Sequence, residues 1–534
     1  MKRTLKVTSL SLGSALLLWL AWPPHALGFM ALIGFVPLLF LQQWHADKKI
    51  KTRTYRWHIY LSLLTWNVLT TWWVWYASEW GSIAAMVLNA LFMSVVWWLF
   101  DTLQRKRSNG IGYIFLLSFW LAYELFHLNW EITWPWLVLG NVFANNTLLV
   151  QWYEFTGHLG GSLWVMLVNI LVFQTLQRYI THDVRFRRSA MQLSVSVLLP
   201  VLLSLSVYAY RSTQRKEGSP FQALLIQPNL DPYTEKFSDD GQALTPQQQL
   251  ERMLQMAEEK ITDSTSFVLF PETALQGSLM EKVIDREFLV ERIREFLQKH
   301  PHACVVSGAD TYTTYEDKAT ETARKARNSD VYIDFFNTAL KIDTSSTVEI
   351  YHKSRLVPGV ERMPYPKIFG FLEEYAIGLG GTSGSLGTQK EASVFTHDGI
   401  KAAPLICYES VFGGYVKEFV SRGAQVLMVV TNDGWWGNTD GYKQHISYGR
   451  LRAIEFRMPL LQCANTGISA GIDALGDYTQ RSHWWVQESM LLNVNACHEQ
   501  TLYARFGDWV GWLGVAGSAM ALMAFFLTRK KPNP

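Results

Sequence analysis

Apolar residues dominate about the first two hundred positions and the last thirty, whereas the middle of the chain carries the charges and turn residues of a soluble domain. A membrane-spanning helix needs about 20 largely apolar residues. Eight stretches approach this length, namely residues 7–22, 25–41, 57–77, 82–103, 111–126, 162–176, 193–210 and 509–527. We therefore predict a membrane domain with about seven transmembrane helices over residues 1–212, a folded domain over residues 220–500, and a final span with a tail over residues 507–534.

The first apolar stretch has two interpretations. Lys2 and Arg3 precede it and Ala26-Leu27-Gly28 follows it, as in a secretory signal peptide with its cleavage site. Apolar sequence returns immediately at Phe29, however, which favours a hairpin of two short spans that are separated by Pro23-Pro24.

Basic residues orient the predicted spans. They cluster in alternate loops and at both ends of the chain, at residues 2–3, 48–53, 105–107, 185–188 and 529–531. The opposite loops, around Pro23-Pro24 and at residues 78–81, carry almost no positive charge. Because positively charged loops remain in the cytoplasm, we expect both termini to be cytoplasmic and residues 210–508 to lie outside. A multi-pass membrane protein with its folded domain on the non-cytoplasmic side fits this pattern.

One non-cytoplasmic loop, residues 127–140, is unusually aromatic and contains Trp130, Trp134 and Trp136. One interpretation is an interfacial belt, because Trp rings favour the depth of the lipid headgroups. The other is a re-entrant platform that holds lipid near the outer domain. Both interpretations predict the same composition.

From Phe221 the pattern changes to short apolar runs that alternate with amphipathic segments. Strand-like runs occur at residues 223–227, 267–270, 303–307, 337–342, 348–351, 402–406, 425–430 and 459–464. Helical segments are predicted at residues 245–262, 281–299 and 443–457, the first of them opened by Thr245 and Gln248 at capping-box spacing and by Pro246. Strands that alternate with helices predict an α/β domain.

Three chemically complementary residues each follow one of the predicted strands. Glu272 follows residues 267–270, Lys353 follows residues 348–351 and Cys407 follows residues 402–406. Ligands gather beyond the carboxyl ends of strands in α/β sheets, so these side chains can converge. A thiol needs a base or a neighbouring cation to become a nucleophile, a carboxylate can take its proton, and an ammonium can stabilise an oxyanion. Taken singly, a core thiol, a surface carboxylate and a solvated lysine would be the simpler interpretations.

Composition excludes several other classes of protein. A net charge of +3 is too small to indicate nucleic-acid binding, and the sequence has no zinc-like Cys/His spacing, P-loop or dinucleotide-binding glycine motif. No metal or organic cofactor is therefore implied. The four cysteines, Cys304, Cys407, Cys463 and Cys497, are too few for a disulfide scaffold, although a pairing among the three other than Cys407 stays open.

Several motifs extend this picture to a known family. They include Pro271-Glu272-Thr273-Ala274, Asn337-Thr338, residues 352–358 (HKSRLVP), Cys407-Tyr408-Glu409, residues 431–437 (TNDGWWG), Gln444-His445, residues 452–455 (RAIE), residues 465–469 (NTGIS) and the Trp134-Pro135-Trp136-Leu137 loop. Residues 223–476 resemble the nitrilase (carbon–nitrogen hydrolase) superfamily, and the whole chain, with spans on both sides, resembles the bacterial apolipoprotein N-acyltransferase family.

The resemblance implies a multi-pass protein of the bacterial inner membrane, with an αββα sandwich on the periplasmic side and a Glu-Lys-Cys triad. By it, Glu272 is the general base, Lys353 the oxyanion-stabilising cation and Cys407 the nucleophile. Asn337, Glu361, Tyr408 and Glu409 match supporting residues, with the Tyr408 backbone N–H in the oxyanion hole. The implied reaction transfers an acyl chain from a phospholipid, through a Cys407 thioester, to the N-terminal diacylglyceryl cysteine of an apolipoprotein. This is the last step of lipoprotein maturation.

Two other functions are open on the same residues. A membrane-anchored amidase or nitrile hydrolase would use the triad with water as acceptor, although one anchor would then suffice. A membrane scaffold with an inactive nitrilase-like domain would not need Glu272, Lys353 and Cys407 together. The Trp435-Trp436 pair can either receive an acyl chain or belong to the core.

Overall fold

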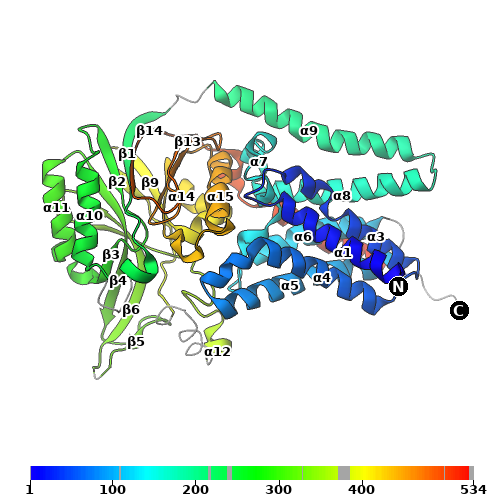
Figure 1. The fold of residues 1–534 in the computed structure, drawn as a ribbon, viewed down its shortest axis with the longest axis horizontal. Coiled ribbons are helices and arrows are strands. Elements are labelled where there is room, and N and C mark those ends of the chain that lie inside the picture. Colours follow the sequence, from blue (N-terminus) through cyan, green and yellow to red (C-terminus); the bar gives the residue numbers. More distant parts are fainter. Residues whose placement is uncertain are drawn as a thin grey trace. The chain divides into compact units, whose positions relative to one another are not determined.

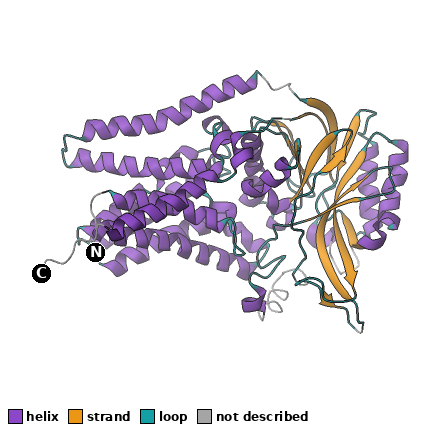
Figure 2. Ribbon diagram, turned by 180° about the vertical axis from the view of Figure 1, so that it is seen from behind, coloured by secondary structure: helices purple, strands orange, loops and turns teal. Residues whose placement is uncertain are grey.

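The chain folds into two compact units. A computed structural model describes residues 2–106, 110–213, 218–236, 243–327, 329–370, 385–497 and 499–527. The helical unit comprises residues 1–75, 80–210 and 506–534, and the α/β unit comprises residues 76–79 and 211–505. Figure 2 shows that helices make up the first unit and that the strands belong to the second.

The helical unit contains long helices and two helices of four residues (Figure 1). They are α1 (Lys2–Ala21), α2 (Ala31–Gly34), α3 (Val36–Ala46), α4 (Thr52–Thr71), α5 (Glu79–Lys106), α6 (Ile111–His127), α7 (Tyr153–Thr156), α8 (His158–Ile180), α9 (Phe186–Ser212) and α17 (Trp509–Leu527). Within the described residues, six segments are long and apolar enough to cross a membrane. They are Arg3–Ala21, Gly28–Ala46, Glu79–Lys106, His158–Ile180, Phe186–Ser212 and Trp509–Leu527.

The predicted number of about eight spans is therefore approximate. The two remaining segments are also helical, but α6 is a shorter apolar helix and α4 is not among the six. The helical and apolar character of this part of the chain is confirmed, whereas residues 107 and 529–531, which belong to the basic clusters that orient the predicted spans, lie outside the described residues.

Aromatic side chains fill the centre of the helical unit. The ring of Phe35 lies 6.2 Å from Trp66, 5.7 Å from Trp97 and 5.4 Å from Trp120 between centroids, and all four side chains are buried. Large rings bury much apolar surface, so this cluster joins the start of α3 to α4, α5 and α6. The predicted aromatic loop is also packed inside this unit, with Trp136 buried and its ring 5.1 Å from Trp73.

Small residues allow α17 to approach α6 closely. A Cβ atom at Gly514 would lie 2.5 Å from the Cβ of Leu121 and 2.8 Å from the carbonyl oxygen of Ser118. A Cβ at Gly511 would likewise lie 2.9 Å from the Cβ of Leu125. Helices in membranes associate through such small-residue contacts, so the C-terminal helix is a packed part of the unit.

Two β-sheets form the centre of the α/β unit. In the first sheet the strand order is β14-β1-β2-β4-β6-β5, with β3 paired to β4 and β7 to β6, and in the second it is β13-β12-β11-β10-β9-β8. The bounds are β1 (Ser219–Gln227), β2 (Thr265–Leu269), β3 (Leu275–Met280), β4 (Cys304–Tyr315), β5 (Arg324–Lys325), β6 (Tyr332–Ile342), β7 (Glu349–His352), β8 (Phe395–His397), β9 (Ile400–Ile406), β10 (Val426–Thr431), β11 (Leu460–Ala464), β12 (Ala470–Ile472), β13 (Tyr478–Arg481) and β14 (Glu488–Ala496).

Helices cover the sheets. Figure 1 shows α10 (Pro246–Glu258) and α11 (Phe288–Lys299) side by side against the first sheet, and α14 (Gly413–Ser421) and α15 (Asp440–Phe456) beside the second. The strands β1 and β11 contact each other across the two sheets, as do β6 and β9. The α12 helix (Pro366–Phe369) and α16 (Leu502–Phe506) are short. The predicted α/β sandwich is confirmed.

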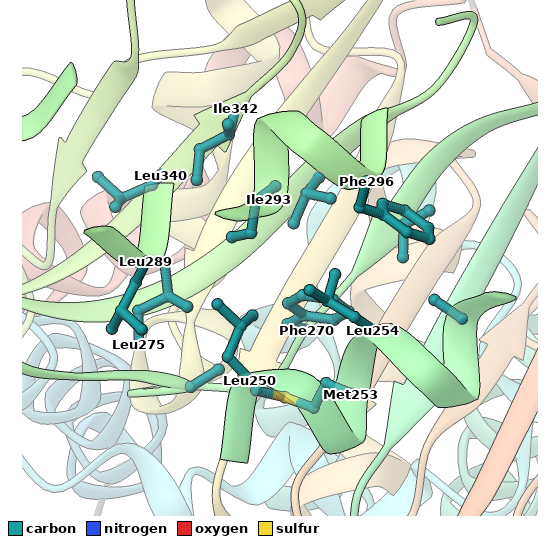
Figure 3. Close-up of a cluster of buried hydrophobic side chains, with 14 of the residues drawn as sticks. Leu250, Met253, Leu254, Phe270, Leu275, Leu289, Ile293, Phe296, Leu340 and Ile342 are labelled. Carbon is teal, nitrogen blue, oxygen red and sulfur yellow. The ribbon is translucent and has the colours of Figure 1, made fainter. Parts of the chain in front are cut away.

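A cluster of buried apolar side chains lies between the first sheet and its helices (Figure 3). Leu250 and Leu254 of α10 and Ile293 and Phe296 of α11 are buried there, against side chains such as Val268 of β2. The predicted start of α10 is also confirmed. The Thr245 hydroxyl accepts a bond from the Gln248 N–H at 3.2 Å, and the Gln248 side chain accepts one from the Thr245 N–H at 2.9 Å.

One predicted helix is wrong in extent. Residues 281–299 do not form a single helix, because a 3₁₀ helix over Glu281–Arg286 is separated from α11 by Glu287 in an extended conformation (φ −67°, ψ 133°). The Glu287 carboxylate accepts a hydrogen bond from the Met280 N–H at 2.9 Å. This bond connects Glu287 to the residue that precedes the 3₁₀ helix.

Strand pairing brings the predicted site residues to the middle of the sandwich. The β2 strand is parallel to β1 and β4, and β9 is parallel to β10, so the segments after β2 and β9 lie at carboxyl edges of the two sheets. The β7 strand pairs antiparallel with β6, in a register that places His352 opposite Thr338. Lys353 consequently follows directly beside Asn337, whose carbonyl accepts its backbone N–H at 2.8 Å.

Candidate active site

Lys353 lies between two carboxylates. Its Nζ donates to Oε1 of Glu272 at 3.1 Å and to Oε1 of Glu361 at 2.7 Å. The Asn337 side-chain N–H₂ donates to the same two oxygens, at 2.9 Å to Glu272 and at 3.1 Å to Glu361. All four residues are buried, Lys353 to 1% exposure. Buried charges persist where they are paired and hydrogen-bonded, and this cluster satisfies both conditions.

The position of Glu272 depends on a close backbone crossing. After β2 the chain passes over β4, where the Gly308 N–H donates to the Pro271 carbonyl at 3.1 Å. A Cβ atom on Gly308 would lie 2.5 Å from the Cα of Glu272 and from the backbone N of Thr273, so only glycine fits there. The second oxygen of Glu272, Oε2, accepts the Asn432 N–H at 3.1 Å, which fixes the carboxylate from the β10 side.

Cys407 occupies a sharp turn between β9 and a 3₁₀ helix over Cys407–Val411. Its φ of 49° is in the left-handed region, which a residue with a Cβ rarely adopts. Such strain clusters at functional sites, and a strand-to-helix turn is a common way to expose a nucleophile. The Cys407 carbonyl accepts bonds from the Ser410 hydroxyl at 2.8 Å and the His445 ring at 3.2 Å, and these bonds hold the turn.

The charges around the thiol define its resting state. Burial raises the pKa of Cys407 well above the usual thiol value, the Glu272 carboxylate raises it further, and Lys353 and a hydrogen bond with Thr431 lower it only in part. Burial also raises the pKa of Glu272, but Lys353 and the Asn337 bond outweigh it, so the net pKa is lowered. Burial lowers the pKa of Lys353, whereas Glu272 and Glu361 raise it well above the usual value. The arrangement therefore holds a neutral thiol, an ionised carboxylate and an ammonium together.

Glu409 connects the segments that carry Cys407 and Lys353. Its Oε2 accepts the Ile406 N–H at 2.9 Å, and its Oε1 accepts the Ser354 N–H at 2.7 Å, the Arg355 N–H at 3.2 Å and the Tyr351 hydroxyl at 2.6 Å. Burial, opposed by these bonds, raises the pKa of Glu409 to about 7. The fully buried Glu409 carboxyl thus sets the distance between the segment that carries Cys407 and the segment that carries Lys353.

The remaining predicted residues lie near the same turn. Tyr408 is buried, with its ring 5.0 Å from Phe412. Trp435 and Trp436 are half-buried, and their rings lie 5.4 Å from Tyr233 and 5.8 Å from His445 respectively.

The prediction from sequence did not identify Lys236. Its Nζ donates to the Glu272 carbonyl at 3.0 Å and to the Thr273 hydroxyl at 2.8 Å. Burial lowers the pKa of Lys236 to about 8, against the opposing charges of Asp310 and Glu272, and burial raises that of Asp310 to about 6. A lysine in a polar segment has the signature of a solvated cation, and only the long-range packing shows that it is buried.

The prediction from sequence also assigned no role to a hydrogen-bonded pair, His445 and Asp433, that lies beside Cys407. His445 Nδ1 lies 3.0 Å from Oδ1 of Asp433, which also accepts the Thr431 hydroxyl at 2.6 Å. Burial lowers the pKa of His445, but Asp433 and the Cys407 carbonyl raise it more, and the net direction is upward. The pair therefore presents a ring N–H to the carbonyl of Cys407. The Gln444-His445 motif was the signal that could have identified it.

The described residues contain no group of three or more His, Cys, Asp or Glu side chains arranged to hold a metal. All four cysteines are free, with Cys304 and Cys463 buried and Cys407 and Cys497 partly exposed. Cys304, Cys463 and Cys497, for which a disulfide stayed open on the sequence alone, are thus free thiols in this structure.

Comparisons with known proteins identify both parts of the chain. Residues 14–171 match the family model of the apolipoprotein N-acyltransferase N-terminal domain, and residues 228–497 match that of carbon-nitrogen hydrolase. The described fold is also similar to a variant of the Nesterenkonia AN1 amidase from the nitrilase superfamily, at 15% identity and a TM-score of 0.35, covering 52% of this chain and 92% of that one.

Full-length relatives are similar over nearly the whole chain. The apolipoprotein N-acyltransferase of Chlorobaculum tepidum is 30% identical over 527 residues, which are 96% of either chain. That of Geobacter metallireducens is 25% identical over 531 residues, which are 96% of this chain and 94% of the relative. With both domains matched and the relatives aligned from end to end, the chain belongs to the apolipoprotein N-acyltransferase family.

Proposed function

We propose that the protein N-acylates the diacylglyceryl-modified N-terminal cysteine of apolipoproteins, with a phospholipid as the acyl donor and Cys407 as the carrier of the acyl chain. The observation that carries this proposal is the position of Lys353. Its ammonium contacts both Glu272 and Glu361, and its positive charge lowers the pKa of the partly exposed Cys407 thiol.

In the first step the Cys407 sulfur attacks the carbonyl carbon of a phospholipid ester while Glu272 takes the thiol proton. A C–S bond forms and the carbonyl oxygen becomes negatively charged. The Lys353 ammonium and the Tyr408 backbone N–H stabilise that oxyanion. The C–O bond to glycerol then breaks, and Glu272 returns its proton to the departing oxygen. The products are a thioester on Cys407 and a lysophospholipid.

In the second step the α-amino group of the diacylglyceryl cysteine attacks the thioester carbonyl. Glu272 takes a proton from the nitrogen and delivers it to the Cys407 sulfur as the C–S bond breaks. The C–N bond that remains is the amide of the triacylated lipoprotein. Both steps use the same three residues, and this ping-pong order needs no metal or organic cofactor.

The electrostatics of the site support general-base catalysis. The pKa of Cys407 is raised and that of Glu272 is lowered, so near neutral pH the thiol is protonated beside an ionised base. The sulfur therefore loses its proton only as it attacks the ester. Between turnovers the thiol stays protonated, which protects it outside the cytoplasm from reactions that need a thiolate.

The membrane context supports lipid substrates, because long acyl chains and lipidated proteins are anchored in a bilayer. We assign the α/β unit to the periplasmic side of the inner membrane and both termini to the cytoplasm. The basic clusters at residues 48–53 and 185–188 carry this assignment.

Intact-protein mass spectrometry after incubation with a phospholipid of defined chains tests the proposal. We expect one added acyl mass that maps to Cys407 and that disappears when a diacylated lipopeptide is added. Cys407→Ala should carry no acyl group. Cys497→Ala is the matched control, because Cys497 is the other partly exposed thiol, and it should be acylated like the wild type.

Two results would overturn the proposal. Release of free fatty acid without transfer to the lipopeptide would identify a hydrolase with water as acceptor. Absence of any adduct from a protein that nevertheless matures lipoproteins would exclude Cys407 as the carrier.

A further inference from the structure

The helical unit contains a cavity of about 1200 Å³ at the end that carries the chain's N-terminus. The first turns of α1, the segment between α3 and α4, the first turns of α4 and the middle of α5 line it. Its cationic lining residues are Arg3, Lys49, Lys51, Arg53 and Arg56. This cavity is lined by none of the residues proposed for acyl transfer.

Most of these cations lack an acidic partner. Within the described part of the chain, only Lys49 has an ion pair, with Asp47 at 2.8 Å on the exposed surface. The Arg56 guanidinium instead lies 5.8 Å from the centroid of the Trp98 ring. Four of the five positive charges are consequently uncompensated by the described side chains, and an anionic group in the cavity would be attracted by all four.

Charged and apolar residues share the lining of the cavity. Lys51 and Arg53 lie at the start of α4, Arg56 follows about one turn later beside the Trp98 ring, and Tyr60 lies about one turn beyond Arg56. Leu91 and Trp98 of α5 line the same cavity. The lining therefore has a cationic end at the start of α4, and apolar residues accompany Arg56 and continue beyond it.

The apolar end faces the surroundings of the helical unit. Trp57 is 58% exposed and Leu91 is 36% exposed, although both lie on helices of a membrane domain. Exposed rings of this kind contact lipid in a bilayer, and Trp and Tyr favour the headgroup boundary. The cavity thus has exposed apolar side chains in its lining and is cationic at the start of α4.

We propose that this cavity binds an anionic glycerophospholipid, with the phosphate among Arg3, Lys51, Arg53 and Arg56 and an acyl chain along Trp57, Tyr60 and Leu91. Basic pockets between transmembrane helices bind anionic headgroups in this way. A free phosphate would leave the apolar end unused, and a zwitterionic headgroup would bring its own cation to the cluster. The volume also exceeds that of pockets for drug-sized ligands, which fits an occupant with a long chain.

Native mass spectrometry of the full-length protein in detergent tests this site. The protein is titrated with phosphatidylglycerol and, separately, with phosphatidylethanolamine that has the same acyl chains. We expect preferential retention of phosphatidylglycerol, and we expect the double variant Arg53→Gln/Arg56→Gln to lower its affinity by roughly 30-fold. The double variant Arg53→Lys/Arg56→Lys keeps the charge and should retain most of the binding.

Arg187→Gln/Arg188→Gln is the matched control, because these two arginines lie at the start of α9 and outside the cavity. We expect it to bind phosphatidylglycerol like the wild type. Melting temperatures of all variants, measured in the same detergent, identify any variant that fails to fold, and the charge-preserving variant then carries the test.

Three outcomes would overturn the proposal. The first is equal retention of the two lipids by the wild type, and the second is an equal loss of affinity for phosphatidylglycerol in the Arg53→Gln/Arg56→Gln variant and in the Arg187→Gln/Arg188→Gln control. The third is displacement of the lipid by millimolar inorganic phosphate. The last would show that the cavity recognises the anion and not the lipid.

Discussion

The ammonium of Lys353 lies closer to Glu361, at 2.7 Å, than to Glu272, at 3.1 Å. Glu361 is itself held by the Val357 N–H at 2.8 Å, which comes from the same loop. The shorter of the two contacts is therefore with Glu361, to which we assign no role in proton transfer. This leaves Glu272 free to exchange a proton while the ammonium stays in place.

Glu361→Gln tests this division of roles. Loss of the Glu361 charge should draw Lys353 towards Glu272 and misplace the oxyanion-stabilising cation, and small misplacements cost about 100-fold in rate. We expect acyl transfer to fall by roughly 10- to 100-fold, with thioester formation slowed as much as overall turnover. Stopped-flow or quenched measurement of acyl-Cys407 formation checks it. An unchanged rate would show that Glu272 alone positions the ammonium.

Glu272→Gln should separate the two effects of Glu272 on Cys407. Removal of the base should slow thioester formation by about 10²- to 10⁴-fold. Removal of the negative charge, which raises the pKa of the thiol, should at the same time shift the pH midpoint of iodoacetamide alkylation to lower pH. Mass spectrometry of alkylation against pH measures that midpoint. A residue with a purely structural role would lose acylation without this shift in alkylation.

Lys353→Met should destabilise the α/β unit. It leaves Glu272 and Glu361 buried without their cation, and breaking a buried ion pair costs about 3 kcal/mol or more. The loss should be smaller at pH 5 than at pH 8, because without the Lys353 charge burial raises the pKa of Glu272, and protonation of that carboxyl removes a buried charge. Thermal unfolding at both pH values checks it. Lys443→Met, which removes a half-exposed pair with Asp440, is the control and should cost less than about 1 kcal/mol.

Glu409 should make the stability of the protein depend on pH. Burial raises the pKa of Glu409 to about 7 in the folded state, so the folded chain binds this proton more tightly than the unfolded chain does. The resulting stabilisation is fully present below the ordinary carboxyl pKa. It is lost as the pH rises towards 7 and beyond, by about 3 kcal/mol in total.

Glu409→Gln removes that titration. The melting temperature of this variant minus that of the wild type, measured in the same buffer, should therefore increase from pH 5 to pH 8. Subtraction of the wild-type curve cancels the other titrating groups. A difference that stays constant with pH would show that Glu409 is ionised throughout.

Local sequence patterns predicted the elements well where the pattern and the packing agree. The capping box of Thr245 and Gln248 marks the start of α10, and the apolar run before Cys407 is β9. The helix predicted over residues 281–299 was wrong in extent, because the extended backbone of Glu287 separates the 3₁₀ helix from α11. Amphipathic spacing continues across that break, so the pattern contains no sign of it.

The site was predicted in part for the same reason. The ends of predicted strands indicated that Glu272, Lys353 and Cys407 converge, because ligands gather beyond the carboxyl ends of strands in α/β sheets. In the structure β2 and β7, which precede Glu272 and Lys353, belong to the first sheet, and β9, which precedes Cys407, belongs to the second. The burial of Lys236 and the contact of His445 with the Cys407 carbonyl depend on segments far apart in the sequence, and no local pattern encodes them. The roles of the triad remain predictions for the acylation and alkylation experiments to test.

The bonds of Glu409 to Ile406, Ser354 and Arg355 have a consequence for the order of catalysis. In the proposed two-step order, the second substrate reacts at the same sulfur as the first. Because both chain segments are bonded to one carboxyl, that sulfur and the Lys353 ammonium keep one spacing for the donor and for the acceptor alike.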